Sequence, residues 1–181
     1  MRHFLYIVFI AVFTFSCKKE STEDKIDRDF VKGDVLIGID STIGLEQLFT
    51  SINPFDLTVD QITGYVFTTT IPSDSIQYIK AVLNSKPYIN TRQFSASVWA
   101  HYQTDIVHNT TILWDMTVQN QQDYIQTKNF LRMTDKLSPT KNMLIKVPIG
   151  QEVFWKDKFK TFTWVRWTDL NWIGGFQLNG R

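Results

Sequence analysis

The sequence predicts an α+β fold built on antiparallel sheets. Short runs rich in Val, Ile and Thr, such as Asp34 to Asp40, predict strands. Between such runs, apolar residues recur at helical spacing, as they do from Leu45 to Ile52. Further along, apolar and polar residues alternate from Phe94 to Tyr102, which is typical of a half-buried strand. Together these patterns predict helices packed on antiparallel sheets.

Residues 1–16 have the pattern of a secretory signal peptide. Arg2 and His3 precede an unbroken apolar stretch from Phe4 to Phe15. A membrane-spanning helix needs about 20 apolar residues, and this stretch is shorter. We therefore predict that the chain is cut before Cys17, and we leave the leader out of the fold.

The residues at the predicted cut resemble the lipobox of bacterial lipoproteins. Thr14-Phe15-Ser16-Cys17 places a small residue before the cysteine, although Thr14 stands where leucine is favoured. Cys17 is the only cysteine of the chain, and Lys18-Lys19-Glu20 begins a polar stretch after it, whereas a buried thiol would need apolar residues on both sides. The resemblance implies that acyl chains such as palmitate are attached to Cys17, and two or more chains hold a protein stably on a membrane.

Residues 17–29 are predicted to form the lipidated cysteine and a disordered tether. Nearly every residue from Lys18 to Asp29 is charged or polar. The stretch resembles the signal that follows the cysteine in surface-exposed lipoproteins of the Bacteroidota, which implies a lipid anchor in the cell envelope, with the outer membrane as first choice. The acids Glu20, Glu23 and Asp24 are scattered, so surface exposure stays open.

Residues 30–93 are predicted to form one small unit. Its elements follow the order β-α-β-β-α-β, in which the second helix begins with a capping box at Asp74 and Gln77. This is the split β-α-β order of a ferredoxin-like sandwich. The predicted strands are Asp34–Asp40, Leu57–Val59, Tyr65–Ile71 and Tyr88–Asn90, and the helices span 45–52 and 76–83.

Residues 94–181 are predicted to form a second, Trp-rich α+β unit. A shift of 76 residues lays Ile71-Pro72 on Val147-Pro148 and Leu83 on Phe159. Either the two halves are ferredoxin-like units in tandem, or two strand-helix-strand segments are similar by chance. The predicted strands are 94–102, 112–118, 143–147, 163–168 and 173–178, the helices are 121–131 and 151–160, and a turn is placed at 108–110.

The composition excludes several function classes. Lys and Arg total 19 and Asp and Glu total 18, and Arg2 leaves with the leader, so the positive excess that nucleic-acid binding requires is absent. The chain has no Gly-x-Ser-x-Gly, phosphate-loop or dinucleotide motif, so we expect no cofactor and no catalytic residues. His101, Asp105 and His108 would converge on zinc from a helix, but the alternation around them predicts a strand and a turn.

The tryptophans are the strongest candidates for a binding surface. All six follow residue 98, and Trp is enriched at interaction hot spots. Trp99 shares its strand face with Ser95, Ser97 and His101 rather than with Val98, so we expect Trp99 to be more exposed than Val98. Trp164 and Trp167 would point to opposite faces of one strand. The predicted binding residues are Trp99, His101 and Trp164, with burial of the tryptophans on both sheet faces as the alternative.

Two resemblances bear on function. The first half resembles the propeptide and inhibitor domains of subtilisin-type proteases, which implies a sheet face that contacts a protease. The lipobox, tether and Trp-rich body together resemble uncharacterised cell-envelope lipoproteins of the Bacteroidota. We therefore expect a membrane-anchored lipoprotein with a non-catalytic binding or assembly role and a partner in the envelope. A protease inhibitor is the second choice and an enzyme the third.

Overall fold

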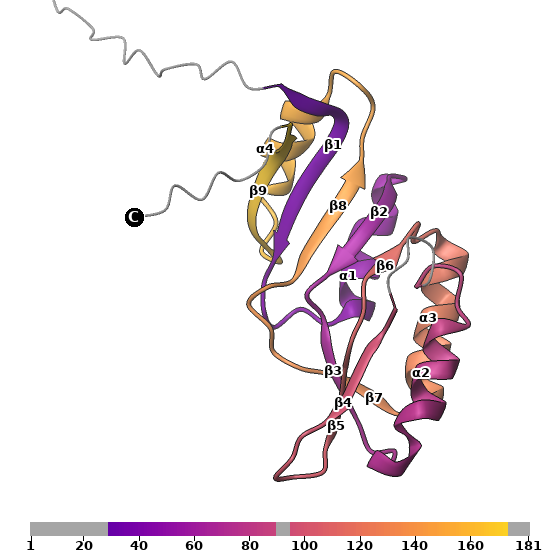
Figure 1. Cartoon of the computed structure of the whole chain (residues 1–181). Coiled ribbons are helices and arrows are strands. Elements are labelled where there is room, and N and C mark those ends of the chain that lie inside the picture. Colours follow the sequence, from indigo (N-terminus) through magenta and orange to yellow (C-terminus); the bar gives the residue numbers. More distant parts are fainter. Residues whose placement is uncertain (1–28, 90–94, 174–181) are drawn as a thin grey trace, which may run out of the picture.

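The computed structural model describes residues 29–89 and 95–173, and the α+β fold is confirmed (Figure 1). The signal peptide, Cys17, the tether up to residue 28 and most of the predicted strand 173–178 lie outside the described residues. The strands are β1 (Phe30–Ile39), β2 (Thr58–Thr63), β3 (Val66–Thr69), β4 (Ser97–Ala100), β5 (Val107–Thr110), β6 (Leu113–Trp114), β7 (Met133–Asp135), β8 (Asn142–Lys146) and β9 (Val165–Trp172). The helices are α1 (Leu45–Ile52), α2 (Ile76–Asn84), α3 (Val118–Phe130) and α4 (Glu152–Phe159), with 3₁₀ turns at Asn53–Phe55 and Ser73–Ser75.

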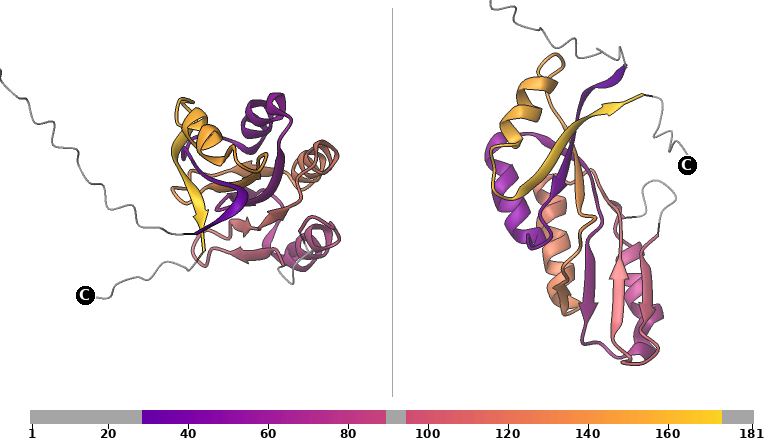
Figure 2. Two further views of the ribbon diagram at one scale, coloured as in Figure 1. Left: turned by 90° about the horizontal axis from the view of Figure 1, so that it is seen from above. Right: turned by 90° about the vertical axis from the view of Figure 1, so that its left-hand side faces the viewer.

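The first sheet has five strands in the order β6-β2-β8-β1-β9, and its pairs are antiparallel. β1 and β2 are joined through α1 and have β8 between them. β8 and β9 are joined through α4 and have β1 between them. Both connections are therefore split β-α-β units. α1 and α4 lie on one face of this sheet (Figure 2).

The second sheet has four strands in the order β4-β5-β3-β7, again antiparallel. β3 and β4 are joined through α2 and flank β5, while β5 and β7 flank β3 and are joined by the segment that contains β6 and α3. In the sequence, the strands of this sheet all lie between β2 and β8. The smaller sheet is therefore inserted into the chain of the larger one, and β6 crosses from it to pair with β2.

The ferredoxin-like unit predicted for residues 30–93 is not confirmed. β1 and β3 would be neighbours in such a unit, but they lie in different sheets. Tyr88 and Ile89, predicted to start a strand, lie in a turn, where the Tyr88 carbonyl accepts a hydrogen bond from the Trp114 amide at 2.8 Å. Both sheets contain strands from both sides of residue 93. The prediction missed this arrangement because a local sequence pattern identifies a strand but not the strand with which it pairs.

The 76-residue spacing reappears in the helices. α2 begins at Ile76 and α4 at Glu152, and each helix follows a strand and leads to a second strand. The returning strands differ, since β9 begins at Val165 whereas β4 begins at Ser97 rather than at Ile89. A common origin of the two segments stays a prediction.

One continuous hydrophobic core joins the two sheets to their helices. The predicted stripe of α1 is confirmed, because Leu45, Leu48, Phe49 and Ile52 are all buried. Full burial of such a side chain contributes about 1.5–3 kcal/mol. Tyr65 and Phe67 continue the core into the four-stranded sheet, so the position of each sheet is fixed by its own helices and by this shared interior.

Candidate functional site

The open face of the four-stranded sheet carries the predicted binding residue Trp99. Val98 is 5% exposed and Trp99 is 40% exposed, which confirms the expected order. α2 and α3 cover the face to which Val98 points, and none of the described helices covers the opposite face (Figures 1 and 2). The same alternation in β5 buries Val107 and Asn109 and leaves His108 on the open face.

A chain of ring contacts links Trp99 to His108, His101 and Tyr102. Trp99 and His108 are directly opposite in the β4–β5 register, and their rings stack with centroids 5.6 Å apart and an interplanar angle of 13°. The ring centroids of His101 and His108 are 6.3 Å apart, and the His101 ring stacks on the Tyr102 ring with centroids 5.2 Å apart. Cross-strand aromatic pairs of this kind stabilise a hairpin and fix the orientation of both rings. We call Trp99, His101, Tyr102 and His108 the aromatic surface.

The tip of the β4–β5 hairpin holds the outer part of this surface in place. The His101 amide donates to the Ile106 carbonyl at 2.9 Å, and the His101 carbonyl accepts from the amides of Thr104 and Asp105. Asp105 adopts a left-handed conformation with φ of 55°, which aspartate tolerates better than most residues. Nδ1 of His101 accepts from the Gln103 amide at 3.3 Å, so in the neutral imidazole the proton lies on Nε2, which can act as a donor.

Hydroxyl groups surround the rings. The row that contains Trp99 and His108 continues across β3 and β7 through Thr68 and Thr134. In the next row Ser97 pairs with Thr110. The side chains in these two rows across β4, β5 and β3, together with Thr134, carry no formal charge when His108 is neutral. Lys136 follows Val66 in the second row, at the β7 edge of the sheet. The open face is therefore aromatic and polar around Trp99 and cationic toward β7.

Trp164 does not join the aromatic surface, which corrects the third predicted binding residue. Trp164 is 7% exposed and packs on Phe159 and Phe162, with ring centroids 6.0 and 5.8 Å away. As strand phase predicts, Trp164 and Trp167 are not both in the core, but the buried one is Trp164, which lies directly before β9. Trp167, inside the strand, is 39% exposed on the five-stranded sheet.

The sequence does not predict Tyr102 and His108 as members of the aromatic surface. The turn predicted at 108–110 is part of β5, and the chain reverses at residues 101–106 instead. Because the predicted turn places His108 outside a strand, its pairing with Trp99 is not predicted. The polar run Gln103-Thr104-Asp105 next to the β-branched pair Ile106-Val107 is the signal that places the turn correctly.

His101, Asp105 and His108 do not come together as a metal site. Within residues 29–89 and 95–173, no three His, Cys, Asp or Glu side chains are close enough together to hold a metal ion. His101 and His108 approach each other through their rings, while Asp105 belongs to the hairpin tip. The hairpin geometry therefore separates residues that would converge on a helix.

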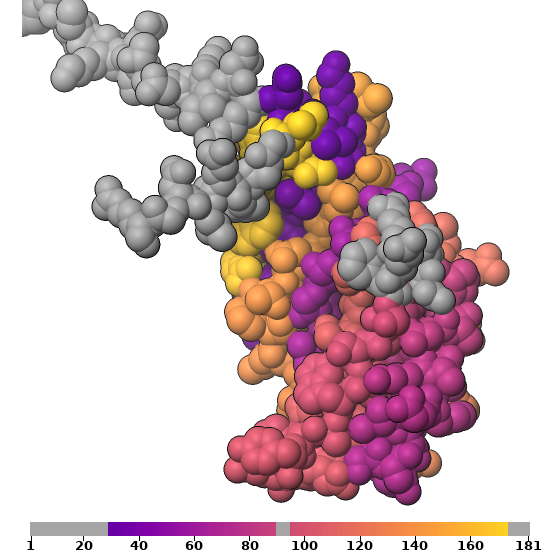
Figure 3. All heavy atoms as spheres, viewed as in Figure 1, coloured from indigo at the N-terminus to yellow at the C-terminus, as the bar shows by residue number. Residues whose placement is uncertain are grey.

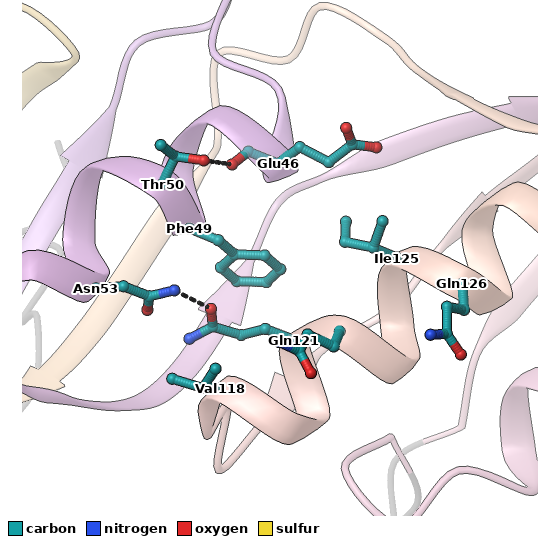
Figure 4. A pocket seen from close by; sticks show the side chains of 9 residues that line it. Glu46, Phe49, Thr50, Asn53, Val118, Gln121, Ile125 and Gln126 are labelled. Atoms are coloured by element: carbon teal, nitrogen blue, oxygen red, sulfur yellow. Dashed lines mark hydrogen bonds between the residues drawn. The ribbon is translucent and has the colours of Figure 1, made fainter.

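A concave region lies between α1 and α3, apart from the aromatic surface (Figure 4). It is a cavity of about 370 Å³ with Phe49 and Ile125 facing each other across it. Asn53 donates to the Gln121 side-chain oxygen at 2.9 Å and closes one side. Among the described residues that line it, Glu46 is the one acid and none is a histidine or cysteine, so these residues offer apolar and amide groups without an acid-base pair.

The buried charges of the chain serve the fold. Lys141 is fully buried, and its ammonium group donates to the carbonyls of Ser41 and Ile43 at 2.7 and 2.8 Å, which fixes the loop before α1. Burial lowers the pKa of Lys141. Asp34 is also buried and is paired with Lys146 at 2.6 Å and with the Asn171 side chain at 2.8 Å. Both buried charges therefore have partners within the fold.

No protein-family model, no curated protein sequence and no solved structure gives a significant match to this chain. The helices that the structure describes include none with the length and apolar character needed to cross a bilayer.

Proposed function

We propose that this protein is a lipid-anchored, non-catalytic binding protein of the bacterial cell envelope, and that the aromatic surface is its binding surface. The observation that carries the proposal is the stacked pair of Trp99 and His108 on an open sheet face. A large aromatic side chain is a typical interaction anchor, and it loses little entropy on binding when its ring is already held.

The exposed rings are costly unless something covers them. Tyr102 is 88% exposed and Ile106 is also exposed beside it at the hairpin tip. Exposed apolar side chains that gather at one place indicate an interaction site, whereas single ones are ordinary. Trp99, Tyr102 and Ile106 come from one short hairpin, so they form such a group.

The shape of the molecule supports this role for an anchored protein. The start of β1 and the tip of the β4–β5 hairpin lie at opposite ends of the molecule (Figure 1), and the hairpin forms a protruding end in the space-filling view (Figure 3). A lipid on Cys17, close in sequence to β1, would hold the β1 end toward the membrane. The aromatic surface would then be presented away from it.

Photo-crosslinking in cells tests the proposal. Tyr102 is replaced by p-benzoylphenylalanine in the full chain, and Tyr78, an exposed tyrosine on α2, is replaced in the same way as the matched control. We expect light-dependent adducts from position 102 and few from position 78. Equal yields at the two positions, or no adduct at position 102, would contradict the proposal.

A further inference from the structure

We propose that the ligand of the aromatic surface is a neutral glycan, an inference that rests on the binding role proposed above. The surface combines a low charge around the rings, one exposed indole and neighbouring hydroxyl groups on an open sheet face. Each of these features selects a ligand chemistry, and the three selections agree.

Charge selects a neutral ligand. The segment from Ser97 to Thr110 contains one carboxylate, Asp105 at the hairpin tip, and no Lys or Arg. The row across the sheet from Trp99 to Thr134 holds His108, Thr68 and Thr134, so it carries no charge when His108 is neutral. A nucleic acid or an anionic headgroup would find no Lys or Arg of β4 or β5 beside the rings, since Arg132 and Lys136 flank β7 at the opposite edge of the sheet. An uncharged ligand loses no ionic hydration at such a face.

The indole selects a ligand with a flat, weakly positive face. One side of the Trp99 ring is covered by the His108 ring, yet 40% of the residue is exposed at the edge strand β4. The π-face of an indole is negative, so it attracts groups that carry partial positive charge. The axial C–H groups of a pyranose ring form such a face, and they are also apolar enough to displace water from the ring.

The neighbouring polar groups select a ligand rich in hydroxyls. Thr68 and Thr134 lie in the same row as the rings, and Ser97 lies next to Trp99 on β4. A hydroxyl both donates and accepts, and Nε2–H of the neutral His101 donates. Sugar hydroxyls also do both, so they can match these groups without leaving an unpaired donor or acceptor. A purely apolar partner would bury these hydroxyls unsatisfied.

Calorimetric titration tests the ligand class. The full-length protein is purified in a zwitterionic detergent, which has no sugar headgroup, and is titrated with neutral hexasaccharides: β-1,4-glucan, β-1,3-glucan, α-1,4-glucan, β-1,4-mannan and β-1,4-N-acetylglucosamine. Hexagalacturonate and hexaglucosamine serve as anionic and cationic controls. We expect at least one neutral hexasaccharide to bind, and to bind more tightly than either control.

Variants link binding to the site. We expect Trp99→Ala to weaken that binding at least about tenfold and Trp99→Phe to weaken it less, since the loss of a central aromatic anchor has this size. Trp167→Ala removes an equally exposed indole from the other sheet and should bind like the wild type. The inference is overturned if no neutral hexasaccharide binds, if the charged ones bind more tightly, or if Trp99→Ala binds normally. Position-102 crosslinks to a protein without glycan binding would leave the binding role standing and remove the glycan.

Discussion

Gly38 and Trp167 are in direct contact across the β1–β9 pair, and the contact leaves no room for a side chain on residue 38. A β-carbon at Gly38 would overlap Nε1, Cε2 and Cδ1 of the Trp167 indole. Gly38 is therefore required for packing rather than for an unusual backbone angle. The indole lies against this glycine at the β1–β9 side of the five-stranded sheet.

Gly38→Ala should consequently destabilise the protein by about 1–3 kcal/mol, because the added methyl group forces the indole away from the sheet. Urea unfolding of the variant measures this loss. In a Trp167→Ala background the same substitution should be nearly neutral, since the clashing ring is gone. Equal losses in both backgrounds would show that the clash is not the cause.

The core position of Trp164 predicts a large effect of its truncation. Its ring packs on Phe159 and Phe162, so Trp164→Ala should lower the free energy of unfolding by about 3–5 kcal/mol. Trp172→Ala, which removes a more exposed indole at the end of β9, is the comparison. Similar losses for the two variants in chemical denaturation would place Trp164 outside the core.

Asp123 predicts a dependence of stability on pH. It accepts from Lys86 at 2.8 Å and from the Tyr88 hydroxyl at 2.6 Å, and these hydrogen bonds hold the pKa of its carboxyl below the usual value. A lowered pKa stabilises the fold above the unfolded value of about 3.9, and this contribution is lost as the pH falls through the folded value.

Asp123→Asn should therefore cost about 1 kcal/mol at pH 7, a figure reduced for the partial exposure of the pair. The difference from the wild type should shrink below about pH 4. Urea unfolding between pH 3 and 7 measures both values. Asp157→Asn, on an exposed pair with Lys160, is the control and should change little at any pH. A constant difference across this range would contradict the linkage.

Cys17→Ser tests the anchor. The substitution removes the thiol that receives the lipid in the lipoproteins that this leader resembles, so we expect loss of palmitate labelling and release of the protein from the membrane fraction. The wild type, with two or more chains, should stay with the membrane in high salt. Palmitate labelling of the variant at the wild-type level would refute lipidation at Cys17.

The sequence predicts local elements of this fold better than their arrangement. The stripe from Leu45 to Ile52 and the strand around Val35 were recognised because burial imposes a period on each element. Pairing depends on contacts between distant residues, and no local pattern shows that β8, rather than β3, lies beside β1. The strands of the smaller sheet are inserted between β2 and β8, but the order of elements along the sequence resembles two consecutive units.

The candidate site shows the same division. The exposure of Trp99 follows from strand phase alone, because Val98 and Ala100 must point the other way. The stacking of His108 on Trp99 follows from register, which is set by where the hairpin turns. A misplaced turn thus hid His108, whereas strand phase separated Trp164 from Trp167 without showing which of the two is buried.

The measurement that tests the central claim most directly combines stability and contact in one variant. Trp99→Ala is introduced into the protein that carries p-benzoylphenylalanine at position 102, and both the free energy of unfolding and the crosslink yield in cells are determined. We expect a stability change below about 1 kcal/mol, since Trp99 lies outside the core, together with at least a tenfold loss of crosslinking. A stability loss above about 3 kcal/mol would make Trp99 a core residue, and an unchanged crosslink yield would show that it is not part of the binding surface.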